Sequence, residues 1–114
     1  MTATFQYFEG DDGDYYWRLR DSNNEIVADG AEGYVSESNV EDAIQNVKQE
    51  VSDGDADFES YEGNGGNYYW RLRDSNNEIV ADGSEGYVSE SNVEDAIQNV
   101  KEEIPEASVE EVDE

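Results

Sequence analysis

The sequence predicts an α+β domain in which a β-β-β-α(-β) unit occurs twice, and both copies contribute to one antiparallel sheet with two helices packed on one face. Two observations carry this prediction. Residues 15–48 recur 53 positions later as residues 68–101, and the copies differ at one of 34 positions, where Ala31 becomes Ser84. Within each copy, apolar residues first alternate with polar ones and then recur at helical spacing.

The duplication indicates one domain with a shared core. A chain of 114 residues has the length of a single domain. A unit of about 50 residues buries too little of its surface to be very stable alone. We therefore expect a single pseudo-symmetric domain over residues 1–114, with repeat one at 3–54 and repeat two at 56–112.

Three strands are predicted at the start of each repeat, over residues 4–9, 15–21 and 25–29 and again over 57–62, 68–74 and 78–82. In segment 15–21, Trp17 and Leu19 alternate with the arginines, which predicts one apolar and one polar face. In segment 25–29, the same alternation places Ile26 on the apolar face and Val27 on the polar face. Asn-rich segments between the strands are typical of turns.

A helix follows the strands in each repeat. Ser38 with Glu41 three residues later has the pattern of a capping box, as do Ser91 and Glu94 in the second repeat. Apolar residues from Val40 to Val51 recur at helical spacing, and the second helix is expected over about 93–104. Residues 107–112 are a candidate last strand. The residues expected in the core are Trp17, Leu19, Ile26, Val40, Ile44, Val47, Trp70, Leu72, Ile79, Val93, Ile97 and Val100.

Several motifs resemble the YegP-like family, and tandem members of that family carry the pattern twice. The motifs are WRLR at 17–20, NNEI at 23–26, GYVS at 33–36, AI at 43–44 and VK at 47–48, all repeated 53 residues later. The resemblance implies a β(3)-α-β unit, two of which form one sheet and exchange their C-terminal strands. Residues 107–112 would then pair with the first half, and the chain would be a monomer that mimics the dimer of single-repeat relatives. Asn24 and Ala43, with their copies, stand where the family usually has Gly. The family is functionally uncharacterised, so the resemblance implies a fold and no activity.

The charge balance is strongly acidic, with 31 Asp and Glu against 6 Lys and Arg and a net charge of −25. Dense carboxylates repel one another and weaken the folded state, and molar salt screens that repulsion. An acidic chain with few aromatics would be disordered, but 11% of these residues are aromatic. We therefore expect a folded, halophilic protein of a high-salt cytoplasm.

The composition excludes several classes of site. The chain has no Cys and no His, which excludes thiol chemistry, Cys/His zinc sites and histidine-based triads. The acidic segment 9–14 lacks the spacing of a calcium loop and is interpreted as a turn. No signal peptide and no apolar segment of about 20 residues is present. We predict no catalytic residue, metal or cofactor, no membrane contact, and a cytoplasmic location.

Four of the six basic residues share one predicted sheet face with two tyrosines: Arg18, Arg20, Arg71, Arg73, Tyr16 and Tyr69. Two interpretations remain open. In the favoured one, the arginines pair across the hairpins with Glu25, Asp29, Glu78 and Asp82. In the other, they form a continuous surface that binds an anion such as a nucleotide or a carboxylate metabolite.

The sequence favours a non-enzymatic interaction or accessory module that binds an unknown protein partner through an exposed sheet edge. An anion or nucleotide-type ligand binder is the alternative, and a small hydrolase is less favoured because no catalytic constellation is recognisable. Nucleic acid is disfavoured as a partner because the net charge repels phosphates.

Overall fold

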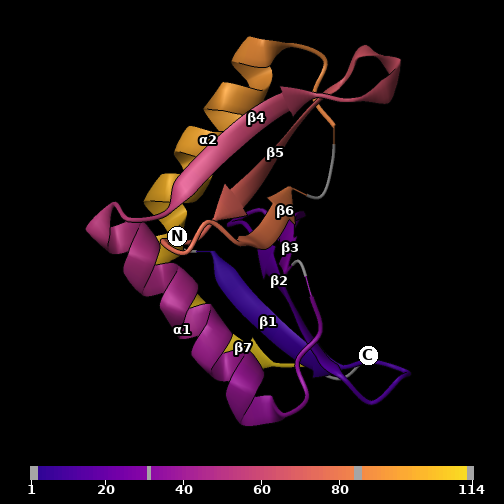
Figure 1. The fold of residues 1–114 in the computed structure, drawn as a ribbon, viewed down its shortest axis with the longest axis vertical. Coiled ribbons are helices and arrows are strands. Elements are labelled where there is room, and N and C mark those ends of the chain that lie inside the picture. Colours follow the sequence, from indigo (N-terminus) through magenta and orange to yellow (C-terminus); the bar gives the residue numbers. More distant parts are fainter. Residues whose placement is uncertain (1–2, 31, 84–85, 113–114) are drawn as a thin grey trace.

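A computed structural model describes residues 3–30, 32–83 and 86–112 as one seven-stranded sheet with two long helices (Figure 1). In chain order, the elements are β1 (Thr4–Glu9), β2 (Tyr15–Arg20), β3 (Ile26–Gly30), α1 (Glu37–Asp53), β4 (Asp57–Glu62), the 3-10 helix η1 (Asn64–Gly66), β5 (Tyr68–Arg73), β6 (Ile79–Gly83), α2 (Glu90–Glu103), the 3-10 helix η2 (Ile104–Glu106) and β7 (Ser108–Glu111). Both helices lie on the same side of the sheet (Figure 1). The predicted α+β fold is confirmed.

The strand order is β4-β5-β6-β3-β2-β1-β7, so the two repeats join through β3 and β6 at the centre. There Asp29 lies opposite Asp82 in an antiparallel pair. The last strand, β7, belongs to the second repeat but pairs with β1 of the first, as the exchange predicted. This pair is parallel, so the sheet is mixed where the sequence predicted an antiparallel one.

The core lies between the helices and the sheet. Trp17, Leu19, Ile44 and their copies are almost fully buried. Every residue predicted for the core is buried except Ile26 and Ile79, which are half-buried. Gly30 lies so close to the Trp17 indole that a Cβ atom there would be 2.5 Å from Nε1. A side chain at that position would therefore displace the ring.

A β-bulge explains the error at Ile26. Leu19 lies opposite Ala28, but its neighbour Arg20 lies opposite Ile26, because the register shifts between them. Directly opposed residues share a face of the sheet, so Ile26 lies on the arginine face, and Val27 instead packs against the core. Unbroken alternation predicts the opposite face for each of these two residues, and a bulge adds one residue that alternation cannot anticipate. The same shift occurs in the second repeat between Leu72 and Arg73.

The helix caps lie two residues earlier than predicted. Ser36 is the N-cap of α1, and its hydroxyl accepts a hydrogen bond from the Asn39 N–H. Ser89 has the same role at α2. The capping boxes predicted at Ser38 and Ser91 are therefore wrong, because both serines already lie inside a helix. The predicted end of α1 is confirmed: Gly54 has φ 79°, a left-handed conformation that glycine adopts without strain.

No helix among the described residues is long and apolar enough to cross a membrane.

Candidate functional site

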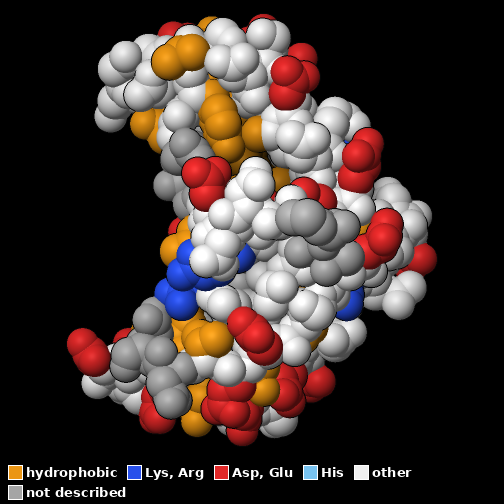
Figure 2. Space-filling model, turned by 180° about the vertical axis from the view of Figure 1, so that it is seen from behind, with side chains coloured by type: hydrophobic (Ala, Val, Ile, Leu, Met, Phe, Trp, Pro, Cys, Tyr) orange, Lys and Arg blue, Asp and Glu red, His pale blue; other side chains and the backbone are white. Residues whose placement is uncertain are grey.

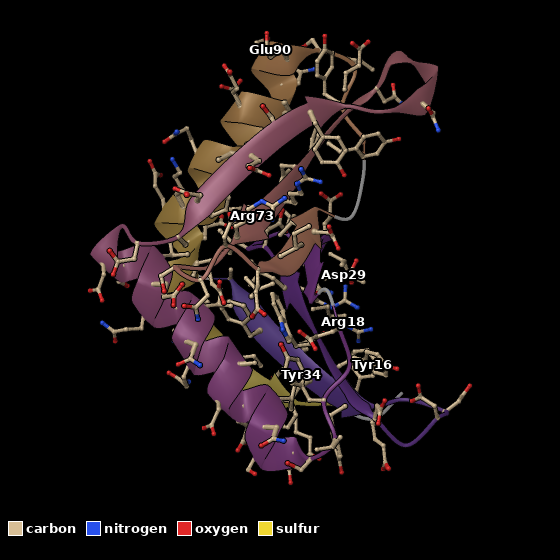
Figure 3. All side chains as sticks on the ribbon, in the orientation of Figure 1. Tyr16, Arg18, Asp29, Tyr34, Arg73 and Glu90 are labelled. Atoms are coloured by element: carbon tan, nitrogen blue, oxygen red, sulfur yellow. The ribbon has the colours of Figure 1, made fainter. Side chains whose placement is uncertain are left out.

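One row of side chains crosses the entire sheet on the face that carries no helix. It takes one residue from each strand, in spatial order: Glu59, Arg71, Asp82, Asp29, Arg18, Gln6 and Glu110. Each is directly opposite the next, and opposed residues on a sheet face interact. Figure 3 shows Arg18 and Asp29 on the side of the sheet away from the helices. We call this set the cross-strand row.

The centre of the cross-strand row is acidic. Asp29 and Asp82 face each other where the repeats meet. Loss of hydration and the neighbouring Asp82 charge raise the pKa of Asp29, and Arg18 opposes this rise. The predicted placement of the two aspartates opposite Arg18 and Arg71 is confirmed. The predicted pairing of arginines with Glu25 and Glu78 is wrong, because the bulges place Ile26 and Ile79 opposite Arg20 and Arg73.

The arginine contacts differ between the repeats at one position. In the second repeat, Glu59 Oε1 accepts from Arg71 Nε at 2.7 Å and from Arg73 Nε at 3.0 Å. These two bonds lower the pKa of Glu59. In the first repeat the equivalent residue is Gln6, whose Oε1 accepts from Arg18 Nε and Arg20 Nε, both at 2.9 Å. A carboxylate in one half thus corresponds to a neutral amide in the other.

The tyrosines predicted for the arginine face form aromatic pairs at its two ends. Tyr16 stacks on Phe8 with ring centroids 6.2 Å apart, and Tyr69 stacks on Tyr61 at 5.9 Å. The Tyr16 hydroxyl also donates to Asp12 Oδ2 at 2.6 Å. That bond raises the pKa of Tyr16 and lowers the pKa of Asp12.

Segment 9–14 is the tight turn that the sequence predicted. The Gly10 N–H bonds to the Asp14 carbonyl at 2.8 Å, and the Asp14 N–H bonds to Asp12 Oδ1. In the part of the chain that the structure describes, no group of three or more acidic side chains has the arrangement of a metal site.

The structure places all six predicted site residues on the helix-free face, but not as one continuous surface. Strands β3 and β6, with Asp29 and Asp82, separate the arginines of β2 from those of β5. Each half has an arginine over an aromatic ring, Arg18 over Phe8 and Arg71 over Tyr61, both at 5.0 Å. Figure 2 shows basic side chains at the middle of a hollow in the molecule, with hydrophobic side chains above and below them.

The two outer edges of the sheet differ more than the two halves of its face. β1 and β4 are equivalent strands of the two repeats. β7 covers the outer edge of β1, with the Ser108 N–H bonded to the Ala3 carbonyl and the Val112 N–H bonded to the Tyr7 carbonyl. Among the described residues, β4 has a strand on one side only, β5. The outer edge of β4 is therefore open, as Figure 1 shows at the upper end of the sheet.

The equivalent lysines of the two helices reflect this difference. Lys48 on α1 donates from Nζ to the Ala107 carbonyl at 2.6 Å, directly before β7 begins. Lys101 on α2 lies instead with its Nζ 5.5 Å from the centre of the Phe58 ring. Phe58 is half-buried, whereas its counterpart Phe5, which β7 covers, is fully buried.

A groove of about 380 Å³ lies between β4 and α2. It is lined by Phe58, Ser60, Glu94, Asp95, Ile97 and Gln98. In the first repeat, Tyr7 stands where Ser60 stands in the second, and its hydroxyl donates to Glu41 and Glu37 of α1. These bonds and burial raise the pKa of Tyr7 well above its usual range. Ser60 lacks that ring, and its small side chain leaves the space beside Glu94 empty as part of the groove.

Two further clefts lie where each helix faces the hairpin of the other repeat. The cleft beside α1 measures about 370 Å³ and the one beside α2 about 500 Å³. Equivalent residues line both, and the lining of the first combines Ala43, Val47 and Val80 with Asp, Glu and Asn side chains. Glu50 in this lining accepts bonds from the Ser75 N–H and hydroxyl. The two clefts therefore share an acidic, amide-rich lining.

Sequence reasoning missed Gln6, Glu59, Ser60 and Lys101 as residues of interest. Lys48 and Lys101 are equivalent in sequence, and their contacts differ only because β7 pairs with β1 and not with β4. The other three residues lie just outside the near-identical segments 15–48 and 68–101, where the informative signal is found. Aligned without gaps, β1 reads TFQYFE and β4 reads DFESYE, so the strands differ at four positions.

Comparisons with known proteins agree on one family. A family model described as a domain of unknown function (DUF1508) matches residues 11–57 and again 64–111. A UPF0339 protein from the 5′ region of the ptx operon of Stutzerimonas stutzeri is 29% identical over 112 residues, which cover 98% of each chain. A UPF0339 protein of Pseudomonas aeruginosa is 30% identical over 109 residues, or 96% of each chain.

Two solution NMR structures share the fold. One is a UPF0339 protein from Shewanella oneidensis, with a TM-score of 0.83, 16% identity, and coverage of 99% of this chain and 93% of that one. The other is the E. coli protein of unknown function yegP, with a TM-score of 0.83, 21% identity, and coverage of 99% and 95%.

Proposed function

Because the chain belongs to the DUF1508 family, whose description assigns no activity, we propose a function from its own geometry. It is a non-enzymatic interaction module that binds an extended segment of a partner protein along the outer edge of β4. The observation that carries the proposal is the difference between equivalent edges: β7 pairs with β1, while β4 lacks a counterpart of β7 among the described residues.

An open edge presents unpaired N–H and C=O groups to any extended chain. The carbonyls of Ala3 and Tyr7 bond to β7, and in a strand the N–H and C=O of alternate residues point the same way. The equivalent carbonyls of Ala56 and Ser60 therefore point outward from β4, as do the N–H and C=O of Phe58 between them. The Ala56 N–H bonds instead to the Glu50 carbonyl at the end of α1. Main-chain bonds of this kind provide affinity in strand addition, and neighbouring pockets provide specificity.

The acidic side chains of β4 oppose pairing between two copies of the chain. Asp57, Glu59 and Glu62 lie along the strand, and charged residues on an edge are a common protection against self-association. The backbone itself remains able to pair, because β4 contains no proline and its pairing with β5 has no bulge. This combination favours a partner of different sequence.

The test is selection of peptides from a random display library, followed by binding measurements on two variants. Ser60→Pro removes an outward N–H without breaking the β5 ladder, since proline is tolerated where the N–H faces solvent. Ser60→Ala is the matched control that keeps the N–H. We expect selected peptides to bind wild type and Ser60→Ala and to lose binding to Ser60→Pro. Equal binding to all three proteins, or no selected peptide, would overturn the proposal.

The helix-free face is a second candidate, as an anion or nucleotide-type binding surface. The favouring observation is the pairing of each arginine with a stacked aromatic pair, Arg18 with Phe8 and Arg71 with Tyr61. Aromatic platforms beside guanidinium groups suit bases and phosphates. Wild type should then show chemical-shift changes at Tyr16 and Tyr69 with a nucleotide panel, and the Arg18→Gln/Arg71→Gln variant should not. An unchanged spectrum across the panel would remove this candidate.

A further inference from the structure

We infer that the segment bound at β4 is basic: an extended peptide that runs parallel to the strand and carries Lys or Arg on both sides of one aliphatic residue. This inference rests on the proposed function and specifies its partner. β7 on β1 is an internal template for a peptide on β4. The four template positions are Ser108, Val109, Glu110 and Glu111, which lie beside Thr4, Phe5, Gln6 and Tyr7.

Between β1 and β4, the residue beside the third template position differs most in its hydrogen-bonding chemistry. On β1, Gln6 uses Oε1 for the arginines and donates from Nε2 to Glu110 Oε1 at 2.8 Å. The amide thus requires an acceptor on the neighbouring strand. On β4 the equivalent Glu59 has only acceptor atoms when ionised, and its lowered pKa keeps it ionised. The peptide must therefore supply a donor at this position, and Lys or Arg also matches the charge.

Beside the first template position, too, β4 has a carboxylate where β1 has a side chain that can donate. The hydroxyls of Thr4 and Ser108 bond to each other at 3.1 Å on β1. The equivalent of Thr4 on β4 is Asp57, a carboxylate that accepts and does not donate. A basic side chain at the first position satisfies it, whereas an acidic one would be repelled.

The second position remains apolar. Val109 lies beside Phe5 and packs against the core. On β4 the corresponding side chain would lie beside Phe58 and enter the groove, where Ile97 forms part of the lining. A β-branched residue suits a half-buried strand position of this kind.

The fourth position gains room and an acidic neighbour. Tyr7 fills this region on β1, but Ser60 on β4 leaves it to the groove, which Glu94 also lines. In the first repeat the carboxylate equivalent to Glu94, Glu41, accepts a bond from the Tyr7 hydroxyl. A long side chain with a donor at its tip, such as Lys or Arg, can cross the groove and satisfy Glu94.

Lys101 is placed to complete the site. Its counterpart Lys48 holds the carbonyl directly before β7, and Lys101 lies over Phe58 at the edge that the peptide would cover. A bound peptide would give Lys101 the carbonyl that Ala107 gives Lys48.

The chain's own tail does not fit these requirements. Residues 107–112 read ASVEEV, which would place Glu beside Glu59 and a second Glu near Glu94. The bound segment is therefore not the C-terminal strand of a second copy.

The experiment compares two peptides that differ in side-chain chemistry at three positions. One is the tail sequence ASVEEV, and the other is AKVKKV, which carries Lys at the first, third and fourth positions. Both are titrated by NMR into the full chain at the lowest KCl concentration that keeps its circular dichroism unchanged. We expect AKVKKV to shift the resonances of Phe58, Ser60 and Lys101 and to bind at least about tenfold more tightly than ASVEEV, the equivalent of two to three exposed charge contacts.

A specificity-switch variant separates the inference from the proposed function. Replacing Asp57→Thr, Glu59→Gln and Ser60→Tyr gives the first four residues of β4 the sequence of β1, and this variant should prefer ASVEEV. Peptide binding that Ser60→Pro abolishes but that shows no preference for Lys would overturn this inference and leave strand addition at β4 intact. Binding that Ser60→Pro leaves unchanged would overturn both. Tighter binding of ASVEEV to wild type would instead identify exchange of tails between copies as the true use of the edge.

Discussion

Gln6 Nε2 donates a hydrogen bond to Glu110 Oε1 at 2.8 Å, and this contact joins the last strand of the second repeat to the first strand of the first. Gln6 holds two arginines through its other amide atom. The amide therefore links the cross-strand row to β7. Its counterpart Glu59 keeps the arginine contacts and cannot donate.

The first prediction concerns this contact. Gln6→Glu should weaken the attachment of β7, because it replaces a donor with a carboxylate opposite Glu110. Loss of one exposed hydrogen bond costs about 1 kcal/mol, which corresponds to roughly fivefold less protection of the Val112 amide, whose N–H bonds to Tyr7. Hydrogen exchange measures this locally, whereas the melting temperature mixes it with the new Glu–Arg contacts.

Charge reversal of the partner is the control. Gln6→Glu combined with Glu110→Lys should restore the protection of Val112, because a donor again faces an acceptor. A double variant that is no better protected than Gln6→Glu alone would contradict the donor–acceptor rule applied to β4.

The second prediction concerns Asp29. Its pKa is raised from 3.8 in the folded state, so its contribution to stability is fully present below that value and is lost as the pH rises through the folded-state pKa. Asp29→Asn removes a charge that loses hydration in the fold and that Asp82 repels, so it should raise the melting temperature at pH 7. The gain should shrink toward zero as the pH falls below about 4. The exposed Glu25→Gln is the control, and an equal gain from Glu25→Gln would show that only net charge matters.

The third prediction tests the helix cap. Ser36→Ala should destabilise the protein by about 1 kcal/mol, because it removes the acceptor for the Asn39 N–H. Ser38→Ala should change stability by less than about 0.5 kcal/mol, the usual range for surface positions. Thermal unfolding of both variants measures the difference, and the reverse order would restore the cap that the sequence predicted.

The fourth prediction concerns salt. With a net charge of −25, the folded state needs screening, and the Debye length falls from about 30 Å at 0.01 M to about 3 Å at 1 M salt. Dialysis to low ionic strength should therefore cause loss of helical circular dichroism, and molar KCl should restore it. A spectrum that stays constant over this range would refute the halophile hypothesis.

Repetition made much of this fold predictable. A near-identical duplicate with clear alternation predicts the strands, the helices and the shared core, and the burial of Trp17 and Ile44 confirms it. The prediction errors occur where the local sequence pattern and the local backbone geometry disagree. Ser38 fits the capping box better by sequence, but Ser36 adopts the extended conformation of a cap. Alternation assigned Ile26 to the core because it assumes an unbroken register, and a bulge breaks that register.

The candidate site was only half predictable. The sequence placed the arginines on one face, since alternation alone decides that. The acidic pair between the two sets of arginines depends on β3 meeting β6 in register, and nothing in either strand specifies a partner strand. The open edge depends on which repeat receives the single C-terminal strand. Comparing β1 with β4, and Gln6 with Glu59 in particular, gives the one sequence signal that the two edges differ.

The most direct test of the open edge is amide hydrogen exchange at equivalent positions of β1 and β4. We predict strong protection of Phe5 and Tyr7, which β7 covers, and fast exchange of Phe58 and Ser60. Addition of AKVKKV should slow exchange of Phe58 and Ser60 in wild type and leave Phe58 unprotected in Ser60→Pro. Protection of Phe58 equal to that of Phe5 without any peptide would contradict the account, because the β4 edge would then already be paired.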